Sequence, residues 1–123
     1  SYGESRSWTD DGVLSKVENY VNGIQNGLQL TYHRNGKISE ESIVSDGILV
    51  GKVNTFYESG EPLEIYEVEE YKHGEYLMFH ENGQLKIQCK YHENELEGEY
   101  CEWDEEGNLV LERFYVEGKL AAI

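Results

Sequence analysis

The sequence feature that most constrains the fold is a regular recurrence of glycines and aromatic residues. Glycines open the units at Gly3, Gly27, Gly51, Gly74 and Gly98. Aromatic residues follow five positions later, at Trp8, Tyr32, Phe56, Phe79 and Trp103, and second glycines stand at Gly12, Gly36, Gly60, Gly83 and Gly107. All three series keep spacings of 24, 24, 23 and 24 residues, so the chain is built from internal repeats. We place the repeats at about residues 3–26, 27–50, 51–73, 74–97 and 98–121 of a single domain, 1–123.

Within each repeat, apolar and polar residues alternate with a period of two, which is typical of β-strands. In the fourth repeat we expect Leu77 and Phe79 on one face, and Tyr76 and Met78 on the other. After Gly83, the alternation predicts that one face holds Leu85, Ile87, Cys89 and Tyr91. Two such strands around a glycine turn indicate a hairpin, and no segment has a helical period. The predicted fold is therefore all-β: an elongated single antiparallel sheet of stacked β-hairpins, roughly 45–50 Å long.

The residues around each second glycine predict a three-residue hairpin loop, in which a type I turn is followed by a glycine in the left-handed region. This loop places Phe79 directly opposite Leu85. The same count pairs Trp8 with Leu14, Tyr32 with Ile38, and Trp103 with Leu109. Cross-strand pairs of an aromatic with an aliphatic residue stabilise sheets, so register and apolar pattern agree.

The third repeat departs from this pattern. Pro62 is inserted after Gly60, and the glycine expected near Glu70 is missing. Because proline cannot donate to a strand ladder, we expect this strand to bulge or to begin late.

Charge is the strongest compositional signal. Ten basic and 25 acidic residues give a formal net charge of −15, and residues 61–123 hold 17 of the acids against five bases. Such a surface repels nucleic acid and anionic membranes and attracts a basic protein. Two cysteines do not form a disulfide framework, which favours a reducing compartment, so we expect a cytoplasmic protein.

The histidines show no catalytic pattern. His33 and His80 occupy the same repeat position, which holds Tyr57 and Asp104 in other copies, so we expect exposed strand or turn residues. No phosphate-binding glycine loop, calcium loop or nucleophile–base set occurs in the sequence. We therefore expect no enzyme, no metal and no cofactor.

The two cysteines offer two interpretations. If His92 faces Gly98, Cys89 lies directly opposite Cys101, at a separation where a disulfide is conceivable. The plainer alternative is two buried thiols. No tetrahedral set of Cys and His accompanies them.

The repeating unit reads as an acidic residue or Asn, then Gly-x-x-x-Gly-x-Tyr-x-x-aromatic-x-x-Asn-Gly-x-Leu. Copies run from Asn22 to Ile38, Asp46 to Leu63, Glu69 to Leu85 and Glu93 to Leu109. This unit resembles the variant MORN repeat (membrane occupation and recognition nexus), and the resemblance covers nearly all of the chain. It implies a single curved antiparallel sheet that binds other proteins, and in some members lipids. Similar repeats occur in bacterial antitoxin-like proteins and in proteins of large DNA viruses.

The candidate binding surface is the face opposite the aromatic–aliphatic pairs. We expect it to hold Tyr57, Tyr66, Tyr76, Met78, Tyr100, Glu102 and Phe114. Tyrosine beside acid on a rigid sheet suits a protein interface, although the same face could simply be partly solvated.

These observations predict a non-catalytic protein-binding module. In its sharper form it is an antitoxin- or immunity-like protein that masks a basic partner. The alternative is a structural scaffold of a multiprotein or viral assembly, with self-association through the sheet. Binding to lipid is disfavoured by the charge.

Overall fold

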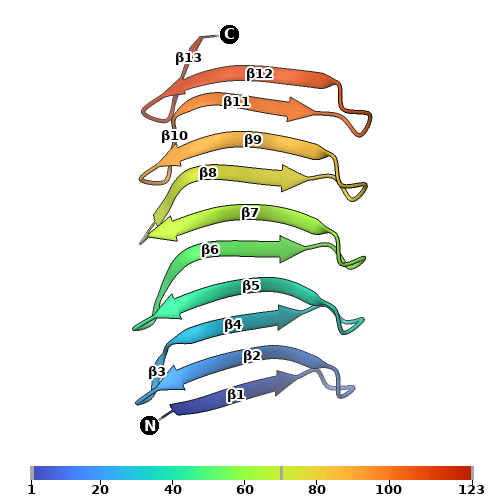
Figure 1. Cartoon of the computed structure of the whole chain (residues 1–123), viewed down its shortest axis with the longest axis vertical. Helices are drawn as coiled ribbons and strands as arrows, with labels where there is room; N and C mark the ends of the chain where they lie inside the picture. Colours follow the sequence, from blue (N-terminus) through green and yellow to red (C-terminus); the bar gives the residue numbers. More distant parts are fainter. Residues whose placement is uncertain (1, 70, 123) are drawn as a thin grey trace.

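The computed structural model describes residues 2–69 and 71–122, which form one antiparallel sheet (Figure 1). Its strands are β1 (Tyr2–Trp8), β2 (Leu14–Val21), β3 (Ile24–Gln25), β4 (Gly27–Tyr32), β5 (Ile38–Ser45), β6 (Ile48–Phe56), β7 (Pro62–Glu69), β8 (Tyr71–Phe79), β9 (Leu85–His92), β10 (Glu95–Leu96), β11 (Gly98–Trp103), β12 (Leu109–Val116) and β13 (Lys119–Ala122). Neighbours in the sheet follow chain order, and the short β3 and β10 extend the turns after β2 and β9. The two termini lie at opposite ends of the sheet (Figure 1). The described residues contain no helix, so the predicted all-β stack of hairpins is confirmed.

The five glycine loops lie along one side of the sheet, on the right in Figure 1. In the fourth repeat, His80 N donates to Gln84 O at 2.8 Å and Gly83 N donates to His80 O at 3.0 Å. Gly83 has φ +90°, a conformation that residues with a Cβ rarely adopt. Phe79 pairs with Leu85 as predicted, and the pairs at Trp8, Tyr32 and Trp103 are confirmed too.

On the other side of the sheet, two-residue turns follow β2, β5, β9 and β12. Val21 pairs with Ile24 around Asn22 and Gly23, which both have positive φ. Two consecutive positive φ values define the type I′ turn, whose twist matches that of paired strands. Glu93 and Asn94 form the same turn between β9 and β10.

A one-residue bulge in β9 changes the predicted faces. Phe79 pairs with Leu85, but the preceding residue, Met78, pairs with Ile87. Successive residues of β8 point to opposite faces, so Leu85 and Ile87 do too. The expectation that Leu85, Ile87, Cys89 and Tyr91 share one face is therefore wrong for Leu85.

In the third repeat, β7 begins at Pro62, which pairs with Phe56. Pro62 stands two residues after Gly60, and the equivalent strands of the other repeats also begin two residues after their glycines, so the predicted late start is wrong. A bulge follows Pro62, but the same bulge occurs at this place in the other repeats, and proline at the first position of a strand needs no ladder donor. Glu70, where the glycine was expected, lies outside the described residues.

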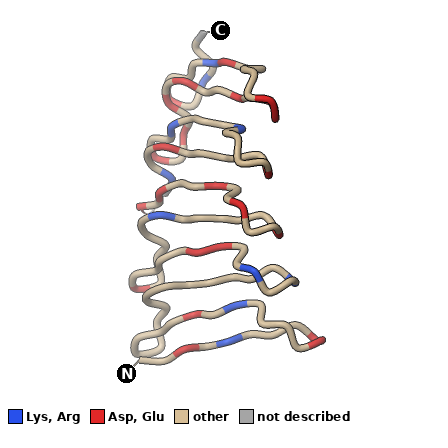
Figure 2. Tube along the Cα trace, turned by 45° about the vertical axis from the view of Figure 1, so that its right-hand side comes forward, with Lys and Arg blue, Asp and Glu red and all other residues tan. Residues whose placement is uncertain are grey.

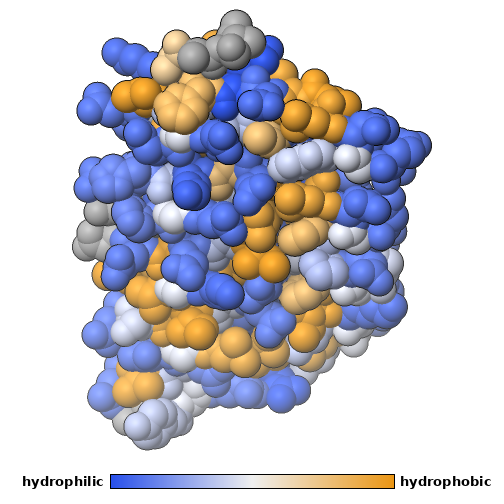
Figure 3. Space-filling view, turned by 45° about the horizontal axis from the view of Figure 1, so that its top comes forward, coloured by the Kyte–Doolittle hydropathy of each residue, from blue (hydrophilic) through white to orange (hydrophobic). Residues whose placement is uncertain are grey.

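The sheet has two unequal faces. We call "buried face" the side that holds Gln29, Ser42, Val44, Val53, Val68, Tyr76 and Cys89, all of which are at most 9% exposed. The opposite side, the "open face", holds Leu28, Leu30, Ile43, Leu77 and Phe114, with Val17 as its buried residue. A single sheet cannot cover both of its sides, and apolar patches stand between hydrophilic side chains in Figure 3.

A ladder of side-chain hydrogen bonds joins one hairpin loop to the next. The bonds are His33 Nε2 with Phe56 O (2.7 Å), Tyr57 Oη with Phe79 O (2.7 Å) and His80 Nε2 with Trp103 O (2.8 Å). At the equivalent place in the last repeat, Asp104 instead accepts from Glu106 N and Asn108 N within its own loop. His33 and His80 are thus half-buried structural donors, which corrects the expectation that they are exposed.

Candidate binding surface

Tyrosines occupy the buried face in its C-terminal half. Tyr66 pairs directly with Tyr76, and their ring centroids lie 5.7 Å apart. Tyr100 takes in the fifth repeat the position that Tyr76 takes in the fourth, while Gln29 and Val53 hold this position in the second and third. This position is therefore aromatic in the fourth and fifth repeats only, although Tyr20 adds a ring to the same face in the first repeat.

Five of the seven predicted surface residues share this face: Tyr66, Tyr76, Met78, Tyr100 and Glu102. Tyr57 lies just beyond the end of β6, where its hydroxyl bonds the next repeat. The prediction is wrong for Phe114. It pairs with Glu99, the residue before Tyr100, and therefore lies on the open face.

Two tyrosines that were not among the predicted surface residues complete the strip. Tyr91 lies opposite Gly74, and Tyr115 lies opposite Gly98. Each packs edge-on against the tyrosine two residues after that glycine, with centroids 6.0 Å and 6.1 Å apart. A glycine leaves room for an aromatic ring on the facing strand, so the Gly-x-Tyr motif was the sequence signal for both.

Three of these rings surround one ammonium group. Lys72 Nζ lies 5.1 Å from the ring centroid of Tyr66 and 5.3 Å from those of Tyr76 and Tyr91. We call these three rings the tyrosine cage. A cation within about 6 Å of a ring centroid is attracted by the negative face of the ring.

Carboxylates hold the hydroxyl groups of two tyrosines of this face, one inside the cage and one beyond it. Tyr76 Oη donates to Glu64 Oε2, and Tyr100 Oη donates to Glu102 Oε2 at 2.7 Å. Burial, with the bond to Glu64, raises the pKa of Tyr76 well above its ordinary value, and the pKa of Tyr100 is raised by burial and by Glu102. Both hydroxyls thus stay protonated donors at neutral pH, and each holds a carboxylate in place.

The repeats match a known family model. The model for the MORN repeat variant matches residues 25–44, 72–94 and 96–117, which together make up more than half of the chain. The chain belongs to the MORN repeat variant family. No curated protein matches it. MORN repeats are in general non-enzymatic binding repeats. The unmatched segment between the first two matches contains the irregular third repeat with Pro62.

The cysteines of this MORN sheet are free and lie on opposite faces. Cys89 is 2% exposed and pairs with Tyr76 on the buried face, whereas Cys101 pairs with Gln88 on the open face. The two-residue turn after β9 and a bulge at Gly98 shift the register by one residue from the predicted one. The expectation that the two thiols face each other is therefore wrong.

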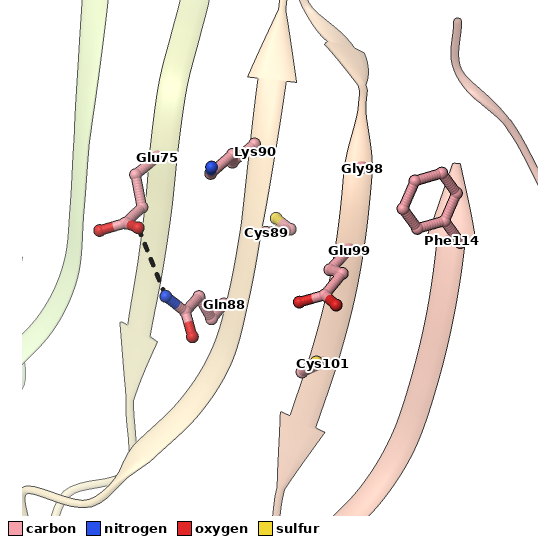
Figure 4. A pocket seen from close by; sticks show the side chains of 8 residues that line it. All are labelled: Glu75, Gln88, Cys89, Lys90, Gly98, Glu99, Cys101 and Phe114. Atoms are coloured by element: carbon pink, nitrogen blue, oxygen red, sulfur yellow. Dashed lines mark hydrogen bonds between the residues drawn. The ribbon is translucent and has the colours of Figure 1, made fainter. Parts of the chain in front are cut away.

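The open face carries a shallow pocket over β8, β9, β11 and β12 (Figure 4). Its side chains include Glu75, Gln88, Lys90, Glu99, Cys101 and Phe114. Gln88 Nε2 donates to Glu75 Oε2 at 3.3 Å, and the acidic Glu75 pairs across the strands with the basic Lys90.

Within residues 2–69 and 71–122 no three His, Cys, Asp or Glu side chains are grouped closely enough to hold a metal ion. Among the same residues, no helix is long and apolar enough to span a membrane.

Acidic side chains mark the hairpin loops, and several loop tips on the right of Figure 2 are red. The exposed acids there are Asp10, Asp11, Glu58, Glu81, Glu105 and Glu106. At the first loop, Arg34 of the next repeat pairs with Asp11. The loops of the fourth and fifth repeats hold Glu81, Glu105 and Glu106 and no basic residue, so the negative charge there is uncompensated within the loops.

Proposed function

We propose that this MORN sheet is a non-catalytic protein-binding module that docks a basic partner on the tyrosine-rich half of its buried face. The observation that carries the proposal is the row of tyrosines held by Glu64 and Glu102 on a continuous sheet. Tyrosine supplies large contact area with few rotatable bonds, and the adjacent carboxylates supply partners for Lys and Arg. The formal charge of residues 61–123, with 17 acids and five bases, would steer such a partner to this half.

In its sharper form, the module is an antitoxin- or immunity-like protein of the cytoplasm that masks a functional surface of a basic protein. Masking needs only steric cover and charge neutralisation, and a sheet without a catalytic centre can supply both. The free cysteines agree with a reducing compartment. We expect no binding to nucleic acid or membrane, because both require basic surface.

The alternative is a scaffold that associates with itself, and one observation favours it. Every residue of β1 is exposed, and only one of its edges is paired. Unpaired backbone groups at a sheet edge can accept another strand. Oligomers that form with rising concentration, without a partner, would support this second reading.

The experiment is an affinity capture from the protein's own source extract, washed at about 0.15 M and about 1 M salt, where the screening length falls from about 8 Å to about 3 Å. The test variant is Tyr100→Ala and its matched control is Phe114→Ala, since these aromatics lie on opposite faces of paired strands. Tyr76→Ala is unsuitable, because Tyr76 is 8% exposed and its loss would test folding. We expect one basic protein, released by salt and lost with Tyr100→Ala only. Equal capture by both variants would refute the assignment of the face.

A further inference from the structure

The tyrosine cage is the most specific recognition feature on the molecule. Its three rings come from three adjacent strands, β7, β8 and β9, and face one ammonium at nearly equal distances of 5.1, 5.3 and 5.3 Å. The rings of Tyr66 and Tyr76 are tilted by 31°, and those of Tyr76 and Tyr91 meet at 77°. Rings at different angles around one point enclose a cation on several sides, the geometry that proteins use to bind alkylammonium groups.

The negative charge around the cage also favours a positively charged ligand. Glu64 Oε2 accepts the hydrogen of the Tyr76 hydroxyl, so a carboxylate lies at the rim of the cage. Glu64 also accepts a hydrogen bond from Thr55 Oγ1 at 3.1 Å, which holds that carboxylate in place. An ammonium entering the cage therefore meets aromatic faces and a fixed negative charge.

Lys72 occupies the cage without an ion pair. Among the described residues, no carboxylate oxygen lies within 4.0 Å of its Nζ, although the chain is strongly acidic. Its backbone is fixed independently, because Lys72 N donates to Asn94 Oδ1 at 2.7 Å and Asn94 N donates to Lys72 O at 2.9 Å. The side chain can leave the cage without breaking a salt bridge or the strand.

We propose that the tyrosine cage is the docking site for a lysine side chain of the basic partner, and that Lys72 is an internal occupant which the partner's lysine replaces. This inference rests on the proposed function and names the group that is recognised. The internal lysine shows that the cage accepts an ammonium on a four-carbon chain. It also lowers the apparent affinity for a partner's lysine, because that lysine must compete with a group already tethered to the site.

The test is an NMR titration of the purified protein with Nα-acetyl-lysine N-methylamide as the probe. The methylene protons next to the probe's ammonium should shift upfield, because they lie over ring faces. Lys72→Ala should raise the affinity for the probe at least five-fold, because the competitor is gone. Lys90→Ala, which removes a lysine of the open face, should leave the affinity unchanged. In the Lys72→Ala background, Tyr91→Leu should abolish the upfield shift.

Two outcomes overturn the inference: an unchanged affinity in Lys72→Ala, or an upfield shift that survives Tyr91→Leu. If Lys72→Ala fails to fold, Lys72→Thr also removes the long side chain from the cage, suits a strand, and takes its place. The same titration with the trimethylated probe or with phosphocholine vesicles tests the competing ligands, and binding of either one alone would refute the assignment to lysine. Because this assay needs no partner, its failure is distinguishable from that of the proposed function, which is judged by the salt-sensitive capture.

Discussion

Gln29 is a buried polar side chain whose replacement should stabilise the sheet. It is 7% exposed on the buried face, and among the described residues its Oε1 has no hydrogen-bond partner. Its Nε2 donates to Asn19 O at 3.4 Å and to Gly27 O at 3.3 Å, both beyond the usual range for N–H···O bonds. The equivalent position in the next repeat holds Val53, which is 1% exposed. The chain therefore already carries a well-buried apolar residue at the equivalent position of another repeat.

The size of the effect follows from these contacts. A buried acceptor without a partner costs about 1–3 kcal/mol, while an ordinary hydrogen bond contributes about 0.5–1.5 kcal/mol. The two long bonds of Gln29 contribute less than that, and valine adds a residue that suits a strand. We therefore expect Gln29→Val to raise the free energy of unfolding by about 1 kcal/mol. For a domain of this size, that corresponds to a rise in melting temperature of about 3–5 °C.

Thermal unfolding followed by circular dichroism, with urea unfolding as a second probe, measures this change. Thr31→Val is the matched control, because Thr31 lies two residues along the same strand and face and is only half-buried. It should change the stability by less than about 0.5 kcal/mol. A Gln29→Val protein that melts at or below the wild-type temperature would show that the amide is better satisfied than its contacts indicate.

Three further predictions concern the backbone, the ladder and a thiol. Gly74→Ala should lower the free energy of unfolding in urea by about 1–2 kcal/mol, because Gly74 has φ +93°. The new Cβ would meet nothing within 4 Å, so the cost comes from the backbone conformation. Gly3→Ala is the control: Gly3 is equally open but has no positive φ, so the change should be nearly neutral. Tyr57→Phe should cost about 1 kcal/mol, since it removes the bond to Phe79 O, and an unchanged urea midpoint would contradict the ladder. Burial raises the pKa of Cys89 to about 11, so the stability that this thiol contributes is present below pH 9 and is lost as the pH rises towards 11. Between pH 8 and 9.5 the free energy of unfolding should fall by roughly 1 kcal/mol from this thiol, and Cys89→Ala should flatten that slope.

The sequence predicted the hairpin loops correctly because their geometry is local. Gly83 and the four residues before it determine the turn, and the turn alone places Phe79 opposite Leu85. The alternation within β8 is equally local, so the separation of Phe79 from Tyr76 and Met78 was also correct. These features need no knowledge of the rest of the sheet.

Pairing between repeats was less predictable because small bulges accumulate there. A two-residue turn and a bulge at Gly98 moved Cys101 from Cys89 to Gln88. Between β7 and β8, Tyr66 pairs with Tyr76 but Val68 pairs with Lys72, so β8 contains two extra residues. That bulge helps to bring Lys72 to the rings, and no spacing in the sequence reveals it.

The division between constant and variable positions indicates where function lies in this array. The glycine and aromatic positions of the loops hold the same kinds of residue in all five repeats: the glycines take the positive φ of the turns, and the aromatic residues form the cross-strand pairs beside them. The central position of the buried face changes from Gln29 through Val53 to Tyr76 and Tyr100. A position that the fold does not constrain is available for recognition. Aromatic residues and excess acid increase together toward the C-terminal half, so a partner's footprint should cover β7–β12 and leave β1–β5 free.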